Sequence, residues 1–528
     1  MNRTTTWRVI AAATALLAAV GLAGCAARSN TASTIRLGWA GDIPPLDPAA
    51  SDSVGSFALL SQLYPSLLTV DPGDEEPTLE IAASADWTEP GVYTIVLKSG
   101  LAFANGDQLT SSDVKFSIER QLALQSEDGA WRDLENIDSV DIVDDTTLTF
   151  RVQTDLDTSL PYVLAGPAGL VLDEESFYAD ELTPDDDIID ADAFAGAYSL
   201  TSKRGDLLVL TPYSAYAGAR PAISTIELHP GTGDDLAAQL DAGSIDAITG
   251  RLDPETLLSL ADNEAVTLSR AASGRVRLLA FDLEHMPFGS RTEAPDATKS
   301  AALRTAISEI IDREDIARSI GGNFVRPLYG YLPDGVPGAS DVFVDLHGDG
   351  AGGPDLDTAT ATLAAAAIET PVELSIHVDL DDVGVPGSDE VAAIASQLEA
   401  TGLFTISVVE TDADGLEAAR LAGQTQAVFT SLLPANSDPQ DYLEPFRSAG
   451  ILSAGYADAN VDTLLTRQLG EVDPAIRATT VLETQTAIAA QLPAIPITQG
   501  VRVVFARSSI EGIQLDDSLP LDLSKMRH

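Results

Sequence analysis

The sequence of 528 residues contains little cysteine, few aromatic residues and few basic residues. Cys25 is the only cysteine, so an internal disulfide is excluded. Aromatic residues make up 5% of the chain, but the hydrophobic fraction of 45% is that of a globular protein. Lys and Arg total 30 against 81 Asp and Glu, which gives a formal net charge of −51. A chain this acidic repels nucleic acids and anionic membrane surfaces, and we therefore exclude both as partners.

A hydrophobic run of membrane-spanning length is also missing. The apolar segment from Val9 to Ala23 follows Arg3 and Arg8 and is short, which is typical of a signal-peptide core. It ends in "LAGC", which resembles a bacterial lipobox, although an ordinary signal peptide with a chance cysteine is the alternative. We predict a signal peptide at residues 1–24, lipidation of Cys25 and a lipid-anchored polar tether at residues 25–34. The mature chain would then lie outside the cytoplasmic membrane, at the cell surface or in a periplasm.

Motifs for catalysis and for metal binding are scarce as well. The chain has no Gly-x-Ser-x-Gly, His-Glu-x-x-His or Gly-x-x-x-x-Gly-Lys motif. The stretch "GDGAGG" at residues 348–353 fits a dinucleotide pattern, but Pro354 and Asp355 stand where a pyrophosphate would dock, which favours a surface linker. An EF-hand reading of the same stretch fails at His347 and Leu356. The five histidines never fall at a close ligand spacing. We predict no catalytic residue, no metal site and no cofactor.

The mature chain alternates predicted strands with predicted helices. Residues 92–97 are short and β-rich, which predicts a strand. Thr110 with Asp113 predicts a helix start close to a capping box. Alternating apolar residues on both arms of residues 137–154 predict a β-hairpin. The helix that follows Thr110 carries one apolar stripe, formed by Val114, Ile118 and Leu122.

Taken in order, these elements resemble the family-5 extracellular solute-binding proteins of ABC importers, the peptide- and nickel-binding type. The core of the resemblance is a Trp-containing strand, a Phe-x-Asn-Gly turn and an Asp-Val-x-Phe-Ser-x-x-Arg helix. Two segments depart from the family, since one lacks the Pro of its Gly-Thr-Gly-Pro-Tyr turn and another lacks a Trp. The matching residues are Trp87, 103–106, 113–120, 46–48, Gly196, Tyr198, Tyr216, Pro221, 243–246, 304–313 and 455–462.

The resemblance implies an α/β, two-lobed periplasmic-binding-protein-like fold of the class II (cluster C) type, with an extra domain and hinge-linked lobes. The segment "RVRLLAFDL" would cross between the lobes as one of two hinge strands, and the lobes would close on a ligand that contacts both. The expected division is lobe I at residues 35–70, 192–277 and 478–523, an extra domain at 71–191, and a second lobe at 278–477.

The segment "SLLPANSDPQDYLEPF", residues 431–446, is predicted to be a loop at the cleft, because Pro434 and Pro439 each lack an N–H group. In the family's peptide binders, an Asp three residues before an Asp-Pro step pairs with the α-ammonium of the peptide. Here that position holds Ala435, and a one-residue shift would offer Asn436, whose amide cannot neutralise a charge. Asp438 is the nearest carboxylate, and it either shapes the turn or binds the ligand.

Two ligand classes remain open, a peptide and a non-peptide solute such as a glycan or a metal chelate. The resemblance implies an ABC permease and its ATPase subunits as partners, a membrane contact through the lipid anchor alone, and a monomer. A surface sensor that uses the same cleft is the other alternative, and an enzyme is disfavoured. The predicted ligand-binding residues are Trp39, Asp42, Phe281, Asp282, Ser431, Leu432, Asn436, Asp438 and Tyr456.

Overall fold

The computed structural model describes residues 34–70, 76–321, 324–434, 436, 438–448, 450, 452, 454–515 and 521–528. The predicted signal peptide, Cys25, all but the last residue of the predicted tether and Ala435 lie outside the described residues. Within the described part of the chain, no helix is long and apolar enough to cross a membrane.

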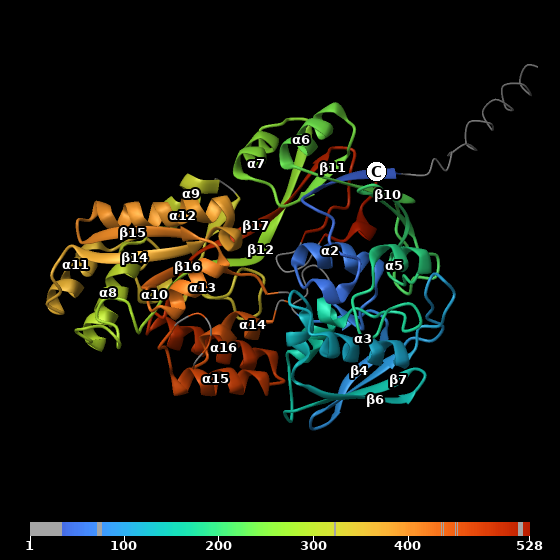
Figure 1. The fold of residues 1–528 in the computed structure, drawn as a ribbon, viewed down its shortest axis with the longest axis horizontal. Coiled ribbons are helices and arrows are strands. Elements are labelled where there is room, and N and C mark those ends of the chain that lie inside the picture. Colours follow the sequence, from blue (N-terminus) through green and yellow to red (C-terminus); the bar gives the residue numbers. More distant parts are fainter. Residues whose placement is uncertain are drawn as a thin grey trace, which may run out of the picture.

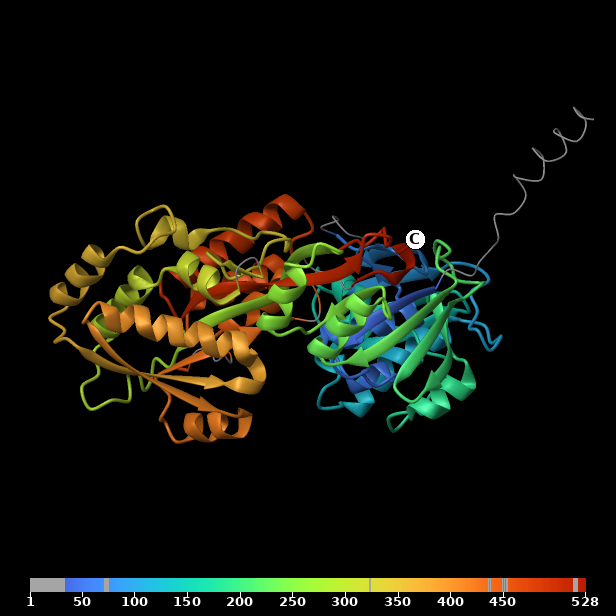
Figure 2. The ribbon, with the colours of Figure 1, turned by 90° about the horizontal axis from the view of Figure 1, so that it is seen from above.

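An eleven-stranded mixed sheet runs through both lobes of the molecule (Figure 1). Its strand order is β15-β14-β16-β12-β17-β11-β1-β10-β9-β8, with β13 paired to β17 off this path. Two long antiparallel strands, β12 (Val266–Phe281) and β17 (Ala494–Arg507), extend from one lobe into the other (Figure 2). Their register shifts between Ala272 and Val276, in the middle of the crossing. The predicted pair of hinge strands is therefore present.

The first lobe is built around β1 (Thr34–Ala40), which pairs in parallel with β10 and with β11. The buried face of β1 carries Ile35, Leu37 and Trp39, as alternation along a strand requires. The other elements of this lobe are β8 (Tyr198–Arg204), β9 (Leu207–Pro212), β10 (Thr225–Gly231), β11 (Ala247–Gly250), α2 (Val54–Leu63), α5 (Asp185–Ala191), α6 (Gly233–Ala242) and α7 (Pro254–Ala261).

A smaller antiparallel sheet with strand order β4-β5-β7-β6 lies below the first lobe in Figure 1. The predicted strand at residues 92–97 is β5 (Val92–Leu97), and the predicted hairpin is formed by β6 (Ile137–Asp144) and β7 (Thr147–Val152). The predicted helix is α3 (Ser111–Leu124), and its capping box between Thr110 and Asp113 is complete. Further elements are β2 (Leu68–Thr69), β3 (Thr78–Leu79), β4 (Ala82–Glu89) and α4 (Leu160–Ala165).

The second lobe holds the parallel strands β14, β15 and β16 and most of the helices. Residues 342–346, which are rich in valine, form the short helix α10. The strands of the second lobe are β13 (Val325–Pro327), β14 (Val372–Asp379), β15 (Phe404–Thr411) and β16 (Ala427–Leu432). Its helices are α8 (Ala297–Ile310), α9 (Arg313–Gly321), α10 (Val342–Leu346), α11 (Leu356–Ala365), α12 (Leu380–Ala400), α13 (Ala413–Leu421), α14 (Pro439–Leu443), α15 (Ala459–Leu469) and α16 (Pro474–Ala489).

The hydrophobic cores support a division of the chain that differs from the expected one at its last boundary. Val481 and Ile488 of α16 are fully buried in the second-lobe core, together with Ile495 and Ile497 of β17. The expected return to lobe I at residue 478 thus falls inside a helix that packs on the second lobe. Because a helix buries one continuous face, the crossing back to lobe I takes place along β17 instead.

Candidate ligand-binding site

A cleft of about 820 Å³ lies between the two lobes and is floored by the hinge strands. Its volume falls in the range of about 300–1,000 Å³ that is typical of small-molecule sites. The first lobe contributes Trp39, Ser53, Gly55, Ala58, Thr249, Gly250, Arg251, Leu252, Asp253, Leu257, Leu521 and Leu523. The hinge strands contribute Ser273, Arg275, Arg277, Gly500, Val501, Arg502 and Val503, and the second lobe contributes Ile320, Phe324, Val325, Val383, Pro386 and Leu433.

Two arginines of β12 reach the cleft because side chains two residues apart share one face of a strand. Arg277 is 7% exposed and donates from Nη1 to Oε1 of Glu390 on α12 at 2.8 Å. Glu390 is fully buried and also accepts a hydrogen bond from Thr498 Oγ1 of β17 at 2.6 Å. This buried ion pair fixes both hinge strands to the second lobe.

Arg275 lies beside the end of β16. Its Nη1 donates to Ser431 Oγ at 2.7 Å and lies 4.0 Å from Oδ1 of Asp382. Burial, followed by the neighbouring charges of Arg277 and Arg251, lowers the pKa of Arg275 to about 10, while Asp382 opposes the shift. The guanidinium therefore lies in a surrounding that is more positive than its one nearby carboxylate can balance.

Of the predicted ligand-binding residues, Trp39 lines the cleft, with 8% of its surface exposed. Ser431 lies next to it through the hydrogen bond from Arg275, and its Oγ also donates to Asp382. Leu432 is half-buried against the second-lobe core, while its neighbour Leu433 lines the cleft. The structure thus places two of the nine residues at the cleft, one of them through an arginine.

Three other predicted residues lie in places suited to packing, and a fourth is exposed. Phe281 and Tyr456 are 1% and 5% exposed within the second-lobe core. The carboxylate of Asp282 accepts hydrogen bonds from the backbone of Glu284 and from Thr425 Oγ1, and its Oδ2 lies 2.9 Å from Nδ1 of His285, which together close a turn after β12. Asp42 follows β1 and is exposed, away from the residues that line the cleft.

The predicted loop at residues 431–446 is only partly a loop. Strand β16 ends at Leu432, and α14 begins at Pro439, which occupies the first helical turn where a missing N–H costs nothing. Asp438 is the N-cap and accepts a hydrogen bond from the backbone N of Gln440 at 2.7 Å. Asn436 Oδ1 accepts from the backbone N of Asp438 at 2.9 Å, so its carbonyl oxygen serves the turn.

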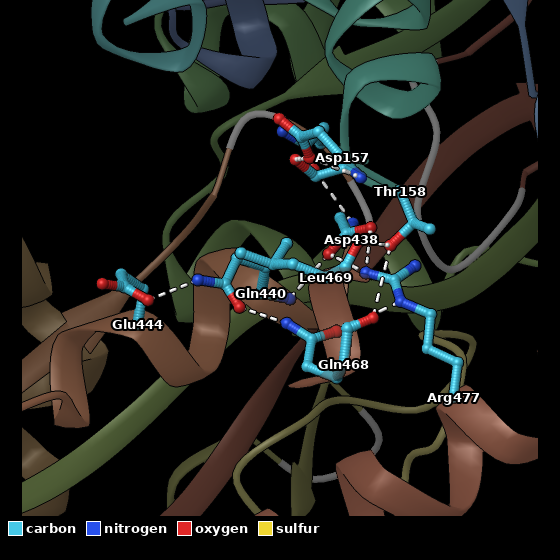
Figure 3. Close-up of polar contacts among 10 residues, drawn as sticks. Asp157, Thr158, Asp438, Gln440, Glu444, Gln468, Leu469 and Arg477 are labelled. Atoms are coloured by element: carbon cyan, nitrogen blue, oxygen red, sulfur yellow. Dashed lines mark hydrogen bonds and ion pairs between the residues drawn. The ribbon is translucent and has the colours of Figure 1, made fainter. Parts of the chain in front are cut away.

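Asp438 also forms a buried ion pair with Arg477 of α16 (Figure 3). Its side chain is fully buried, and Arg477 Nη2 donates to Oδ1 and Oδ2 at 2.8 and 2.7 Å. Arg477 Nε donates in turn to Gln468 Oε1 at 3.1 Å. Both oxygens of Asp438 are occupied, so this geometry favours the turn-shaping alternative over the ligand-binding one.

The second lobe meets the small domain beside this ion pair. The backbone N of Thr158 donates to the carbonyl oxygen of Leu469 at 3.0 Å, and Thr158 Oγ1 donates to the same oxygen at 3.1 Å. Figure 3 shows Asp157 and Thr158 reaching down toward α14 and the end of α15. Arg477 lies 6.0 Å from the ring of Tyr162 in α4. The small domain and the second lobe are thus in direct contact at this point.

One group of carboxylates among the described residues is close enough to hold a cation, formed by Asp113, Glu174 and Glu175. Asp113 is occupied by the helix cap, since its Oδ2 accepts from the backbone N of Thr110 at 2.7 Å. Its Oδ1 accepts from the backbone N of Glu174 at 3.2 Å. The cluster is explained by these local hydrogen bonds.

None of the four arginines of the cleft was predicted from the sequence, and these are Arg251, Arg275, Arg277 and Arg502. A signal was present for two of them, because Arg275 and Arg277 stand two residues apart in a predicted crossing strand of a chain with few basic residues. No comparable signal marked Arg251 and Arg502, which come to the cleft only through the tertiary fold.

Two lobes joined by two long strands, with a ligand-sized cleft between them, define a hinge-linked solute-binding protein. The chain belongs to family 5 of the bacterial extracellular solute-binding proteins, since residues 76–453 match that family. The resemblance predicted from the sequence and the two-lobed fold are thereby confirmed.

Individual relatives agree with this assignment. The chain is 26% identical over 317 residues to the probable D,D-dipeptide-binding periplasmic protein DdpA of Escherichia coli K12, and the match spans only 57% of each chain. Its fold is similar to that of HbpA2 from Haemophilus parasuis, with a TM-score of 0.79 and 18% identity over 94% of this chain and 99% of the other. A dipeptide-binding protein from Pseudoalteromonas sp. SM9913, in complex with Met-Leu, has a similar fold with a TM-score of 0.70. The sequence identity is 18%, and the match covers 93% of this chain and 99% of the other.

Proposed function

We propose that the chain is a lipid-anchored binding protein that captures a small solute, a peptide or a peptide-like compound, and delivers it to the permease of an ABC importer. The observation that carries this proposal is the cleft of about 820 Å³, which both lobes and both hinge strands line. A ligand that contacts both lobes stabilises the closed arrangement over the open one, which is how such a protein signals its loaded state.

The peptide class is supported by the relatives, because DdpA and the Pseudoalteromonas protein are described as binding dipeptides. A non-peptide solute is the second candidate. It is favoured by Ala435, which stands where the resemblance expects the ammonium-pairing Asp. A surface sensor would use the same cleft, and co-purification of a permease with the chain distinguishes an importer component from a sensor.

The experiment that tests solute capture is native mass spectrometry of the freshly purified full chain. We expect a fraction of the protein to carry a small non-covalent mass, which is released unchanged on denaturation. The same compound, added back, should raise Tm without being consumed, since a ligand that binds only the native state stabilises it by mass action. Turnover of the released compound would contradict a pure binding function and support an enzyme.

Anchoring is tested separately at Cys25, by the substitution Cys25→Ser in a cell that expresses the full chain. Without the thiol no acyl chain can be attached, so we expect the protein to move from the membrane fraction to the periplasm or the medium. Membrane attachment of the variant equal to that of the parent chain would contradict the lipobox prediction. The cytoplasmic fraction is the control for failed export.

A further inference from the structure

The charges that line the cleft differ in sign from those of the rest of the molecule. The whole chain has 81 acidic residues against 30 basic ones, but the cleft is lined by four arginines and a single carboxylate, that of Asp253. A surface composition as acidic as that of this chain would give the opposite ratio. The arginines therefore make the cleft a positively charged region of an acidic protein. The ligand of a hinge-linked protein is held at the floor of the cleft, where Arg275 and Arg277 lie.

Asp253 forms no ion pair with these arginines among the described residues, and its carboxylate caps a helix instead. It is the N-cap of α7, where Oδ1 accepts from the backbone N of Thr256 at 2.9 Å and Oδ2 accepts from Thr256 Oγ1 at 2.7 Å. These hydrogen bonds lower the pKa of Asp253 despite its partial burial. Among the described residues that line the cleft, no carboxylate is left to pair with an ammonium group of a ligand.

Arg277 is neutralised by Glu390 but keeps a free donor. Its buried Nε has no hydrogen-bond partner among the described residues, although the side chain is 7% exposed. A buried donor without an acceptor destabilises the folded state, and more so when the group is charged.

Arg251 and Arg275 offer the least compensated charges. Arg251 is exposed at the first-lobe wall, and its side chain forms no hydrogen bond or ion pair with the described residues. Arg275 lies at the floor, where the oxygens of Asp382 are shared with Thr430 Oγ1 and the backbone N of Ser431. Arg251 belongs to the first-lobe wall and Arg275 to a hinge strand, beside Ser431 and Asp382 of the second lobe, so one acidic group between the two guanidinium groups would contact both sides of the cleft.

We propose that the cleft selects a small solute with a net negative charge, whose carboxylate or phosphate groups are bound by Arg251 and Arg275. The inference rests on the proposed function and names the chemical class of its solute. Arginine suits this task because its planar guanidinium binds carboxylate and phosphate in a bidentate manner. An ordinary peptide with neutral side chains could offer its α-carboxylate to these arginines, but its free α-ammonium would find no carboxylate to pair with.

The test compares probes of similar size and different charge on the purified full chain. The acidic probes are the dipeptide Glu-Glu, citrate and glucose 6-phosphate, which separate peptide carboxylates, other carboxylates and phosphates. The matched probes are Ala-Ala, Lys-Lys and glucose. We expect at least one acidic probe to raise Tm and to give a measurable Kd by calorimetry, while its matched probe gives neither.

Variants then assign the binding to the two arginines. Arg251→Gln and Arg275→Gln should each raise the Kd of the acidic probe at least tenfold, with Tm of the unliganded protein changed little for the exposed Arg251. Arg420→Gln, on the exposed surface of α13, is the control and should leave Kd within twofold. Because Arg251 is exposed, loss of folding cannot explain its effect.

The possible failures are distinguishable. Binding of Ala-Ala, Lys-Lys or glucose in the absence of binding by their acidic partners would overturn the charge selection and leave solute capture intact. Acidic binding that neither substitution weakens would overturn the assignment to Arg251 and Arg275. If no probe binds, the compound that co-purifies with the protein decides between the outcomes. An acidic compound supports the inference, and a neutral or basic compound overturns it. If no compound co-purifies, the proposed function itself is overturned.

Discussion

At the scale of single residues, Asp438 and Arg477 illustrate how a side chain expected at the ligand is used by the fold. Asp438 is fully buried and binds Arg477 through both carboxylate oxygens, and it is also the N-cap residue of α14. Burial raises the pKa of Asp438, and Arg477 opposes that shift. A buried pair of this kind is costly to break, because the remaining charge is left without a partner.

The substitution Asp438→Asn should therefore lower the free energy of unfolding by about 3 kcal/mol. Urea denaturation followed by circular dichroism measures this, with Asp206→Asn in the exposed β8–β9 turn as the control. The double variant Asp438→Leu with Arg477→Met should recover part of the loss, because it removes both charges. A loss below about 0.5 kcal/mol, the scale of an ordinary surface substitution, would contradict the importance of the pair.

Glu80 is the residue whose protonation should affect stability near neutral pH. Its Oε2 accepts from the backbone N of Ser66 at 2.9 Å and its Oε1 accepts from Tyr216 Oη at 3.2 Å. Burial nevertheless raises the pKa of Glu80 to about 7. In the unfolded chain a glutamic acid titrates near pH 4.3. The folded protein therefore holds a proton that the unfolded chain releases between these two pH values.

This difference favours the folded state below about pH 4.3, and the contribution is lost as the pH rises through about 7. Relative to the parent chain, Glu80→Gln should gain on the order of 2 kcal/mol in unfolding free energy between pH 4.5 and pH 8. Urea denaturation of both proteins at a series of pH values measures the difference. Glu89→Gln, exposed at the end of β4, should show no such gain, and a flat difference for Glu80→Gln would refute the assignment.

At the scale of elements, local patterns predicted the small domain well. The capping box of α3, the strand β5 and the hairpin of β6 and β7 all formed where apolar periodicity and capping residues placed them. These signals lie within a few residues of each other in the sequence. An element governed by distant contacts was predicted less well, since α16, in which the return to lobe I was expected at residue 478, packs on the second lobe.

The sequence showed the residues of the family motifs but not the residues that they contact in the fold. Asp47, in the Leu-Asp-Pro turn, and Arg120, at the end of the α3 motif, form a buried bidentate pair with distances of 2.9 and 2.6 Å. Gly196 packs so closely that an added Cβ would lie 2.5 Å from the carbonyl oxygen of Gln62. A single sequence shows that such residues occur, but it does not show which segments meet. The arginines of the cleft were missed for this reason.

At the scale of the whole molecule, the contact between Thr158 and the end of α15 bears on closure. It joins the small domain, which is attached to the first lobe, to the second lobe at a point away from the hinge. A hydrogen bond that exists only when the lobes are together adds to the stability of the closed state. The affinity for a solute then depends on a residue that does not touch it.

Thr158→Val keeps the size of the side chain and removes its hydroxyl donor. We expect the Kd of a solute to rise about threefold to tenfold, which corresponds to a net hydrogen-bond contribution of about 0.5–1.5 kcal/mol. Calorimetry measures Kd, and small-angle scattering should show a smaller ligand-induced decrease in radius of gyration. Thr463→Val, exposed on α15, is the control. Unchanged affinity with unchanged closure would show that the contact does not contribute.

The position of β17 in the large sheet has a consequence for the order in which the protein is made. This strand lies between β12 and β11, although it comes from the last part of the chain, and Leu523 and Met526 pack into the same lobe that β1 begins. Until residues 494–507 leave the ribosome, β11 presents an unpaired edge and the first lobe lacks its central strand. The nascent chain therefore cannot complete the strand pairing of its first lobe before the segments of its second lobe have been made.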